Sequence, residues 1–361
     1  MTLTGPIDSE LWMFIPGPVN VHPDVRRSLA TPPINHRGRE FSELYERVCA
    51  KVRRLLRTEG RVYLSTSSAI GIQEAVARNC VAKRSLHLVC GAFSQNWQEI
   101  AVACGKQADA LSVEWGRANL PDALEEALAK THYDTVCVVH SETSTSVQNP
   151  LSALAAVVRR FPGTLLCVDA VSSLGAAPVL VDDWGVDVCF ASVQKGLALP
   201  PGFAVFSVSE RALERAASVP NRGYYFDFLV FEEYAKKSQT PTTPSLPHMF
   251  ALDVQLGRIE TEGLENRWER HRTMATMAQR WAEERYECFA EAPHRSASVT
   301  AVRNTRGTDI AKLNAHLKSL GMVLAPGYGR IKSETFRIGH VGETTPVQLQ
   351  RLLDAIDTFI G

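Results

Sequence analysis

Short β-rich apolar runs alternate with longer segments of helical periodicity between about residue 60 and residue 210. The expected strands cover residues 62–65, 86–90, 110–113, 135–140, 164–169, 186–191 and 203–208. Helix-compatible periodicity lies between them, at residues 72–82, 95–104, 120–130 and 151–161. Strands and helices that alternate in this way are typical of a mostly parallel sheet with helices on both faces. The pattern predicts an α/β fold.

The pattern changes after a segment rich in Thr and Pro at residues 240–247. Long charged helices such as 264–285 follow, and then a mixed tail. The last expected helix, 346–360, carries its apolar residues mainly on one stripe. A chain of 361 residues is long enough for two domains. We expect a large domain with an N-terminal arm at residues 1–262 and a small α+β domain at 263–361.

Composition excludes several classes of protein. With 45% hydrophobic and 22% charged residues, the chain is typical of soluble globular proteins. Lys plus Arg and Asp plus Glu both number 39, so no overall positive field attracts nucleic acid or an anionic membrane. The sequence shows neither a signal-peptide pattern at its start nor an apolar run long enough to cross a bilayer. We expect a cytoplasmic protein.

The eight cysteines never occur in a Cys-Xaa-Xaa-Cys pair, the spacing typical of zinc ribbons and thioredoxin-like redox sites. Four of them, Cys90, Cys137, Cys167 and Cys189, lie in or beside apolar strand-like runs, where thiols act as small buried hydrophobes. This usage indicates a reducing compartment and no metal site.

Lys195 is the first candidate for chemistry. It lies in the segment Ser192–Gly196, directly after an expected buried strand. A loop lysine is normally a solvated charge, but the carboxyl ends of strands form the edge where open α/β sheets bind ligands. Burial at that edge would lower the pKa of the amine and suit it to imine chemistry.

Asp169 ends the preceding strand, after the apolar run 165–168. An aspartate here commonly caps a turn. However, Asp169 and Lys195 end successive strands and can therefore face one crevice. A carboxylate beside a pyridine nitrogen keeps that nitrogen protonated, which makes the ring an electron sink. The pair predicts pyridoxal 5′-phosphate (PLP) as cofactor, held by Lys195 as a Schiff base.

Several motifs spread over nearly the whole chain support this interpretation. They are Pro16-Gly17-Pro18, His36-Arg37, residues 140–145, residues 168–173, Ser192–Gly196 with Pro200-Pro201-Gly202, residues 263–266 and residues 336–340. In these motifs the chain closely resembles the class V aminotransferases of PLP fold type I, in particular the alanine–glyoxylate and serine–pyruvate group. The resemblance implies transfer of an amino group from alanine or serine to glyoxylate or pyruvate.

The resemblance also implies roles for individual residues around the cofactor ring. Lys195 would carry the cofactor and move a proton, and Asp169 would bind the ring nitrogen. Val171 would pack on one ring face and Phe93 would stack on the other, although an ordinary core aromatic is the competing interpretation for Phe93.

Ser144 and Gln194 correspond to polar residues near the ring hydroxyl and the phosphate, with turn capping as the alternative. Arg337 corresponds to the family's carboxylate-binding arginine, whose guanidinium can form two parallel hydrogen bonds to an α-carboxylate. Gly17 would leave room for substrate in the same pocket.

The expected phosphate site departs from the family pattern. Relatives carry Gly-Ser-Gly-Thr or Gly-Ser-Gly-His, whereas this chain has Ser67-Ser68-Ala69-Ile70. We expect Ser68, Ala69 and Ile70 to contact the phosphate at the start of the following helix, whose N-terminus favours anions.

The segment 240–244 resembles the family loop that reaches across a dimer interface to the phosphate. We therefore expect a homodimer in which Thr240 and Thr243 of one chain complete the cofactor site of the other. A rigid proline-rich linker is the alternative interpretation of this segment.

Other activities of the same fold remain open. They include phosphoserine, aspartate and aminoethylphosphonate aminotransferases, and PLP lyases and desulfurases. A desulfurase needs a mobile reactive cysteine, and the cysteines here lie mainly in core-like contexts. A catalytically silent regulatory subunit is a further alternative, supported only by the altered segment 67–70.

Overall fold

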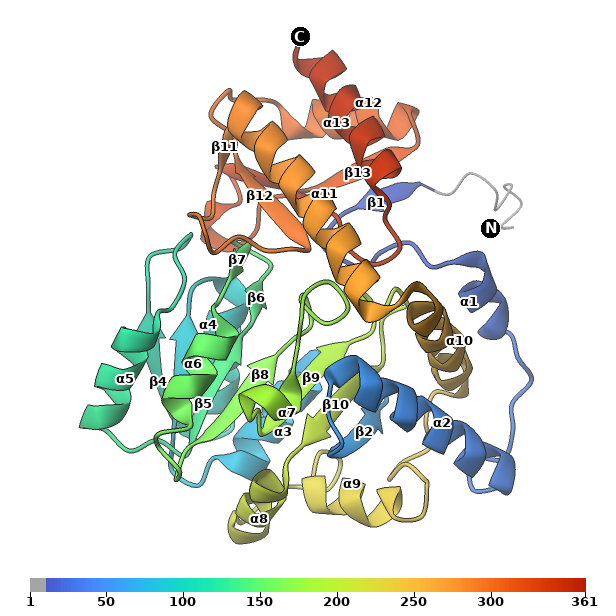
Figure 1. The fold of residues 1–361 in the computed structure, drawn as a ribbon, viewed down its shortest axis with the longest axis vertical. Helices are drawn as coiled ribbons and strands as arrows, with labels where there is room; N and C mark the ends of the chain where they lie inside the picture. Colours follow the sequence, from blue (N-terminus) through green and yellow to red (C-terminus); the bar gives the residue numbers. More distant parts are fainter. Residues whose placement is uncertain (1–10) are drawn as a thin grey trace.

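The computed structural model describes residues 11–361, which form two sheets (Figure 1). The larger sheet has seven strands, and only β10 runs antiparallel to its neighbours. In spatial order the strands are β2 (Arg61–Ser65), β10 (Ala204–Val208), β9 (Val188–Ser192), β8 (Leu165–Asp169), β5 (Thr135–Val139), β3 (Arg84–Val89) and β4 (Gln107–Ser112). The predicted α/β fold with a mostly parallel sheet is confirmed.

Helices cover both faces of this sheet. Side chains alternate along a strand, so Val136 and Val138 of β5 join the core on one face, while Cys137 and Val139 join the core on the other. The first core contains α2 (Arg39–Leu56), α5 (Pro121–Lys130), α6 (Leu151–Val158), α7 (Val181–Trp184) and α10 (Leu246–Glu262). The second core contains α3 (Ala69–Cys80), α4 (Ala92–Ala103), α8 (Glu210–Ser218) and α9 (Phe228–Ala235).

The second sheet has five strands, in the order β1 (Trp12–Phe14), β13 (Met322–Pro326), β14 (Thr335–Gly339), β12 (Val299–Arg303) and β11 (Glu287–Cys288). It packs against α11 (Leu264–Arg285), α12 (Ile310–Ser319) and α13 (Pro346–Ile360) around a separate apolar core. Strand β1 pairs with β13, so residues 12–14 complete a sheet built otherwise from the C-terminal part of the chain. The predicted division of the chain at residue 262 stays a prediction. The structure shows in addition that strand β1, from the predicted N-terminal arm, belongs to the second sheet.

The remaining elements are short. They are α1 (Pro23–Ser28), the two-stranded ladder of β6 (Ser141–Glu142) and β7 (Val147–Gln148), and the 3₁₀ turn η1 (Gly329–Ile331). The Thr- and Pro-rich segment 240–247 overlaps the start of α10, which begins at Leu246. Pro247 is tolerated in the first turn of this helix because the backbone N–H groups there have no partner within the helix.

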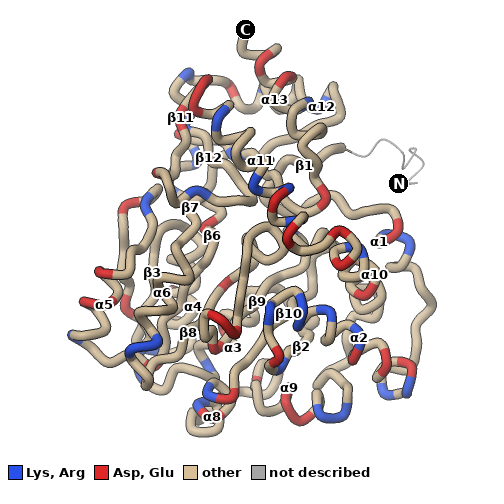
Figure 2. The backbone as a smooth tube through the Cα atoms, in the orientation of Figure 1, with Lys and Arg blue, Asp and Glu red and all other residues tan. Residues whose placement is uncertain are grey.

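Acidic and basic residues are interspersed over the fold, as Figure 2 shows. None of the helices in residues 11–361 has the length and apolar character needed to cross a membrane.

Candidate active site

A cavity of about 490 Å³ lies between the two sheets, at the carboxyl edge of the parallel strands. Asp169 is the last residue of β8, and Lys195 follows the end of β9, as expected from the sequence. The second sheet contributes Arg337 from β14. Ten of the predicted site residues line this cavity, namely Gly17, Ser68, Ala69, Ile70, Phe93, Asp169, Val171, Gln194, Lys195 and Arg337.

The amine of Lys195 is held by two hydroxyl groups. Its Nζ donates to Thr143 Oγ1 at 2.9 Å and to Ser172 Oγ at 2.7 Å. Burial lowers the pKa of Lys195 to about 8, although the nearby carboxylates of Asp169 and Glu142 act in the opposite direction. A lysine with this pKa has an appreciable neutral fraction close to neutral pH, which nucleophilic attack on a carbonyl requires.

The carboxylate of Asp169 is buried and accepts two hydrogen bonds. Oδ1 accepts from the backbone N–H of Val171 at 2.9 Å, and Oδ2 accepts from Gln73 Nε2 at 2.8 Å. Burial raises the pKa of Asp169 to about 6, while these two donors and the charge of Lys195 limit the rise. Asp169 is therefore mostly ionised at neutral pH and can pair with a protonated ring nitrogen.

Gln73 was missed by the sequence interpretation. It lies on α3, is 4% exposed and lines the cavity beside Asp169. Its Oε1 has no hydrogen-bond partner within residues 11–361, and the same is true of Gln194 Oε1 at the cavity wall. A buried acceptor without a donor is costly, so the two oxygens mark positions where a bound molecule can donate. Together with Asp169 and Lys195, they form a donor and acceptor set that fits PLP.

Two aromatic rings stack at the cavity. Phe93 and Tyr328 lie 5.1 Å apart between ring centroids, with planes inclined by 12°. Glu142 fixes the start of α4, because its carboxylate accepts from the backbone N–H groups of Phe93 and Ser94. The predicted stacking of Phe93 on a cofactor ring remains a prediction; its ring lies 5.4 Å from Lys195 Nζ.

Arg337 is a buried guanidinium that forms no direct ion pair with a carboxylate of residues 11–361, although the charge of Glu142 acts on it from a greater distance. It donates to the carbonyl groups of Pro326 at 3.1 Å and Thr143 at 3.4 Å, and it lies over the ring of Tyr328. Burial lowers its pKa to about 10, which still leaves it charged. A buried cation without an anion is costly, so the site favours a ligand that brings a carboxylate.

The expected phosphate end of the cavity is poor in polar side chains. Ser68 precedes α3 but makes no side-chain cap bond, and the backbone N–H of Ala69 donates to Ser192 Oγ at 2.6 Å. Ile70 is 54% exposed. The departure from the family motif therefore removes side-chain donors at Ala69 and Ile70, whereas Ser68, Ser192 and Gln194 still line the cavity.

Three predicted residues do not line the cavity within one chain. The hydroxyl of Ser144 is buried between Glu142 and the backbone of Ala92, and its neighbour Thr143 faces the cavity instead. Thr240 is buried and donates to its own loop, whereas Thr243 is exposed. Their predicted contacts with the cofactor stay predictions, and those of Thr240 and Thr243 require a second copy.

The chain matches the family described as "Aminotransferase class-V" over residues 26–328. An aminotransferase of Methanocaldococcus jannaschii is 36% identical over 91% of this chain and 87% of the relative. The serine–glyoxylate aminotransferase of Methylorubrum extorquens is 33% identical over 93% of this chain and 88% of that protein. The crystal structure of an alanine–glyoxylate aminotransferase from Nostoc sp. superposes with a TM-score of 0.91 at 26% identity, covering 98% and 96% of the two chains. The protein belongs to the class V aminotransferase family and is a transaminase.

Proposed function

We propose that the protein uses PLP to move the amino group of alanine or serine to a small 2-oxo acid such as glyoxylate or pyruvate. The observation that carries the proposal is the meeting of Lys195, Asp169 and the unneutralised Arg337 at one cavity. Amino transfer requires three such groups: an amine nucleophile, a carboxylate that pairs with the ring nitrogen of the cofactor, and a guanidinium that binds the α-carboxylate of the substrate.

PLP, when bound, supplies an electron-withdrawing ring that stabilises negative charge developing at the substrate's α-carbon. Asp169 holds a proton at the ring nitrogen, and the donors from Gln73 and Val171 keep its carboxylate ionised. The Lys195 amine binds the cofactor and, once displaced, can accept a proton at Nζ and return it. Thr143 and Ser172 orient that amine.

The cavity wall supports a small substrate with a single carboxylate. Arg337 and Lys195 are the only cationic side chains among its lining residues within 11–361. Because Lys195 is engaged by the cofactor, Arg337 remains to hold one carboxylate. Gly17 leaves room at the lysine, since a Cβ there would lie 2.8 Å from Lys195 Cγ and would press on the stem of that side chain. The names of the relatives, serine–glyoxylate and alanine–glyoxylate aminotransferases, support the same substrate class.

We further propose that the enzyme is a homodimer in which the loop 240–244 completes the partner's phosphate site. Arg37 fixes this loop by donating to the carbonyl groups of Thr240 and Pro241. Thr243 is exposed, with a long 3.5 Å contact from its hydroxyl to His36 Nε2, and its side chain is accessible to another chain. The shortage of polar side chains at Ala69 and Ile70 is the deficit that such a hydroxyl would compensate.

Spectroscopy of the PLP-loaded protein tests the proposal. Addition of alanine or serine should replace the visible absorbance of the cofactor–lysine link with that of pyridoxamine phosphate, and glyoxylate or pyruvate should reverse the change. A protein that stays colourless with PLP, or whose spectrum ignores every small amino acid, would support the silent-subunit alternative instead. Phosphoserine or aspartate as much better donors would refute the proposed substrate class while leaving PLP chemistry intact.

A further inference from the structure

Arg267 is a fully buried arginine at the junction between the part of the chain that holds the larger sheet and the part that holds the second sheet. It lies in the first turn of α11, which starts next to α10 and runs from there along the second sheet (Figure 1), and its side chain is 1% exposed. Removing a guanidinium from water costs several kcal/mol unless hydrogen bonds and counter-charges replace the solvent. A helix rich in charged residues offers many solvated positions, so the burial of this one indicates a specific use.

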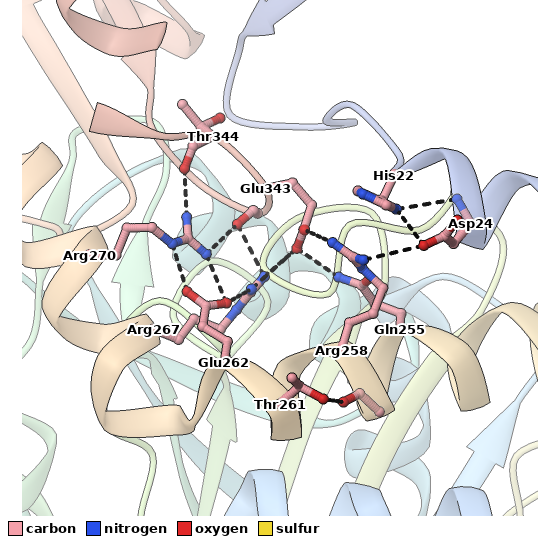
Figure 3. Close-up of polar contacts among 12 residues, drawn as sticks. His22, Asp24, Gln255, Arg258, Thr261, Glu262, Arg267, Arg270, Glu343 and Thr344 are labelled. Carbon is pink, nitrogen blue, oxygen red and sulfur yellow. Dashed lines mark hydrogen bonds and ion pairs between the residues drawn. The ribbon is translucent and has the colours of Figure 1, made fainter. Parts of the chain in front are cut away.

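Two carboxylates and two carbonyl groups surround the guanidinium. Nη1 donates to Glu262 at 2.6 Å, and Nη2 lies 3.2 Å from Glu343 Oε1. The same Nη2 donates to the backbone carbonyl groups of Gly196 at 2.8 Å and Gly342 at 3.1 Å. Figure 3 shows Arg267 between the two glutamates. The contact with Gly196 matters most, because Gly196 directly follows Lys195.

The turn that carries Lys195 has little freedom to move. A Cβ at Gly196 would lie 2.0 Å from the carbonyl oxygen of Leu174, so the backbone is pressed against that segment. The carbonyl of Gln194 accepts from Val19 at 3.1 Å, and that of Lys195 accepts from Ala198 at 2.9 Å. The next carbonyl along the chain, that of Gly196, accepts its hydrogen bond from the side chain of Arg267, which comes from the distant helix α11.

Glu343 connects the same guanidinium to the substrate side of the cavity. It lies in the loop after β14, the strand that carries Arg337. Its carboxylate also accepts from Gln255 at 2.9 Å and Arg258 at 3.0 Å (Figure 3). Burial alone would raise the pKa of Glu343, but Arg267 and these donors hold it at about 2, so the carboxylate is ionised. The network therefore joins the Lys195 turn to the loop that directly follows the strand of Arg337.

We propose that Arg267 is a positioning residue for amino transfer, which fixes the Lys195–Gly196 turn relative to the carboxylate-binding strand through Gly196 and Glu343. The inference rests on the proposed role of Lys195. Without the guanidinium, the turn loses its link to the small domain, water reaches the Lys195 amine, and the amine is no longer held at a constant distance from the substrate bound by Arg337.

Arg270 provides a matched control three residues along the same helix. It shares Glu262 and the Gly342 carbonyl with Arg267 and also donates to Thr344, but it does not contact Gly196. Arg267→Lys and Arg270→Lys keep the charge and remove the planar fork in both cases. Any effect confined to the Arg267 variant is therefore an effect of the contacts that only Arg267 makes, those with the Gly196 carbonyl and with Glu343.

The main readout uses the protein without cofactor. Competitive acetylation followed by mass spectrometry gives the pKa of the Lys195 amine, which burial sets at about 8 in the native protein. The charged groups that act on this amine, Asp169, Glu142 and Arg337, keep their contacts in both variants. In Arg267→Lys we expect the pKa of Lys195 to rise toward that of a solvated lysine, whereas in Arg270→Lys it should stay at its native value.

The second readout is the half-reaction with alanine, where Arg267→Lys should lower kcat by about tenfold to a hundredfold with a smaller change in KM. Equal pKa values of Lys195 and equal kcat in the two variants would overturn the role of Arg267, even with both variants less stable than the native protein. Failure of the native protein to bind PLP through Lys195 would instead overturn the proposed function.

A double variant covers the outcome in which Arg267→Lys does not fold. Arg267→Met with Glu343→Gln removes the buried cation together with the charge of one of its two carboxylate partners, and replacing both members of such a pair is commonly tolerated. It leaves the Gly196 carbonyl without its donor. We expect a folded protein with a raised Lys195 pKa and low kcat, and a folded double variant with native values of both would contradict the proposal.

Discussion

Gln73 donates a hydrogen bond to Asp169 Oδ2 at 2.8 Å from helix α3, which packs against one face of the larger sheet. The bond matters because Asp169 is buried, and burial by itself favours the protonated carboxyl. A donor on the second oxygen opposes that effect. Gln73, a residue outside the recognised family motifs, thus adds to the backbone N–H of Val171 and the charge of Lys195 in keeping the pKa of Asp169 from rising further.

Replacing Gln73 with Leu should raise the pKa of Asp169 above about 6, because the charged form loses a donor. Transamination at pH 7 should fall by about tenfold, the equivalent of one hydrogen bond to a charged group. The acid limb of the kcat/KM profile should move to higher pH. Gln73→Glu, which adds a second carboxylate, should move it further, and an unshifted limb in both variants would show that Gln73 has no influence on Asp169.

Asp169→Asn should stabilise the cofactor-free protein while removing most of its activity. The folded-state pKa of about 6 exceeds the unfolded value of about 3.9, so the protonated carboxyl favours folding below pH 4 and this contribution is lost as pH rises through 6. At pH 8 the neutral amide should therefore gain up to about 3 kcal/mol, with little gain at pH 4. Urea unfolding at both pH values measures the difference. A variant less stable at pH 8 would contradict the burial argument.

Arg337→Lys should raise the KM for donor and acceptor alike by about tenfold or more, since one ammonium cannot reproduce two parallel hydrogen bonds. Steady-state kinetics of both half-reactions provide the measurement. Arg330→Lys is a suitable control, because Arg330 is exposed and lies over Trp115 outside the main cavity. Similar KM changes in the two variants would remove Arg337 from the substrate site.

Thr243→Ala should weaken PLP binding without dissociating the dimer and with little change in its stability, because the side chain is exposed and its contact with His36 within the chain is long, at 3.5 Å. The neighbouring Thr242→Ala serves as control. Light scattering gives the oligomeric state, and titration with PLP gives the affinity. An active monomer, or equal affinity in the variant and the native protein, would refute the shared site.

The sequence predicted the parts of the site that depend on strand ends. Asp169 and Lys195 follow apolar runs, and parallel strands bring their carboxyl ends to one edge, so their meeting required no knowledge of side-chain packing. The departure from the family's phosphate-binding motif at Ala69 and Ile70 was also visible in the sequence, because neither side chain has a polar atom. The overall fold followed from the same alternation of strand and helix patterns.

Residues brought in by tertiary packing escaped prediction. Gln73 reaches Asp169 only because α3 lies against the sheet, and a glutamine on a helix has no local signal for that contact. The choice between Ser144 and Thr143 depends on the conformation of the short turn between β6 and β7, which periodicity does not resolve. Arg267 belongs to a charged helix whose pattern is typical of a solvated surface, yet it is buried.

Borohydride reduction of the PLP-loaded protein, followed by peptide mapping, tests the central claim most directly. Reduction makes the link between cofactor and lysine permanent, so mass spectrometry identifies the lysine. We expect the label on Lys195 alone, and no label in Lys195→Ala, which should also lose transamination while remaining folded. A label on any other lysine of the native protein, or none at all, would contradict the assignment of this cavity as the site of amino transfer.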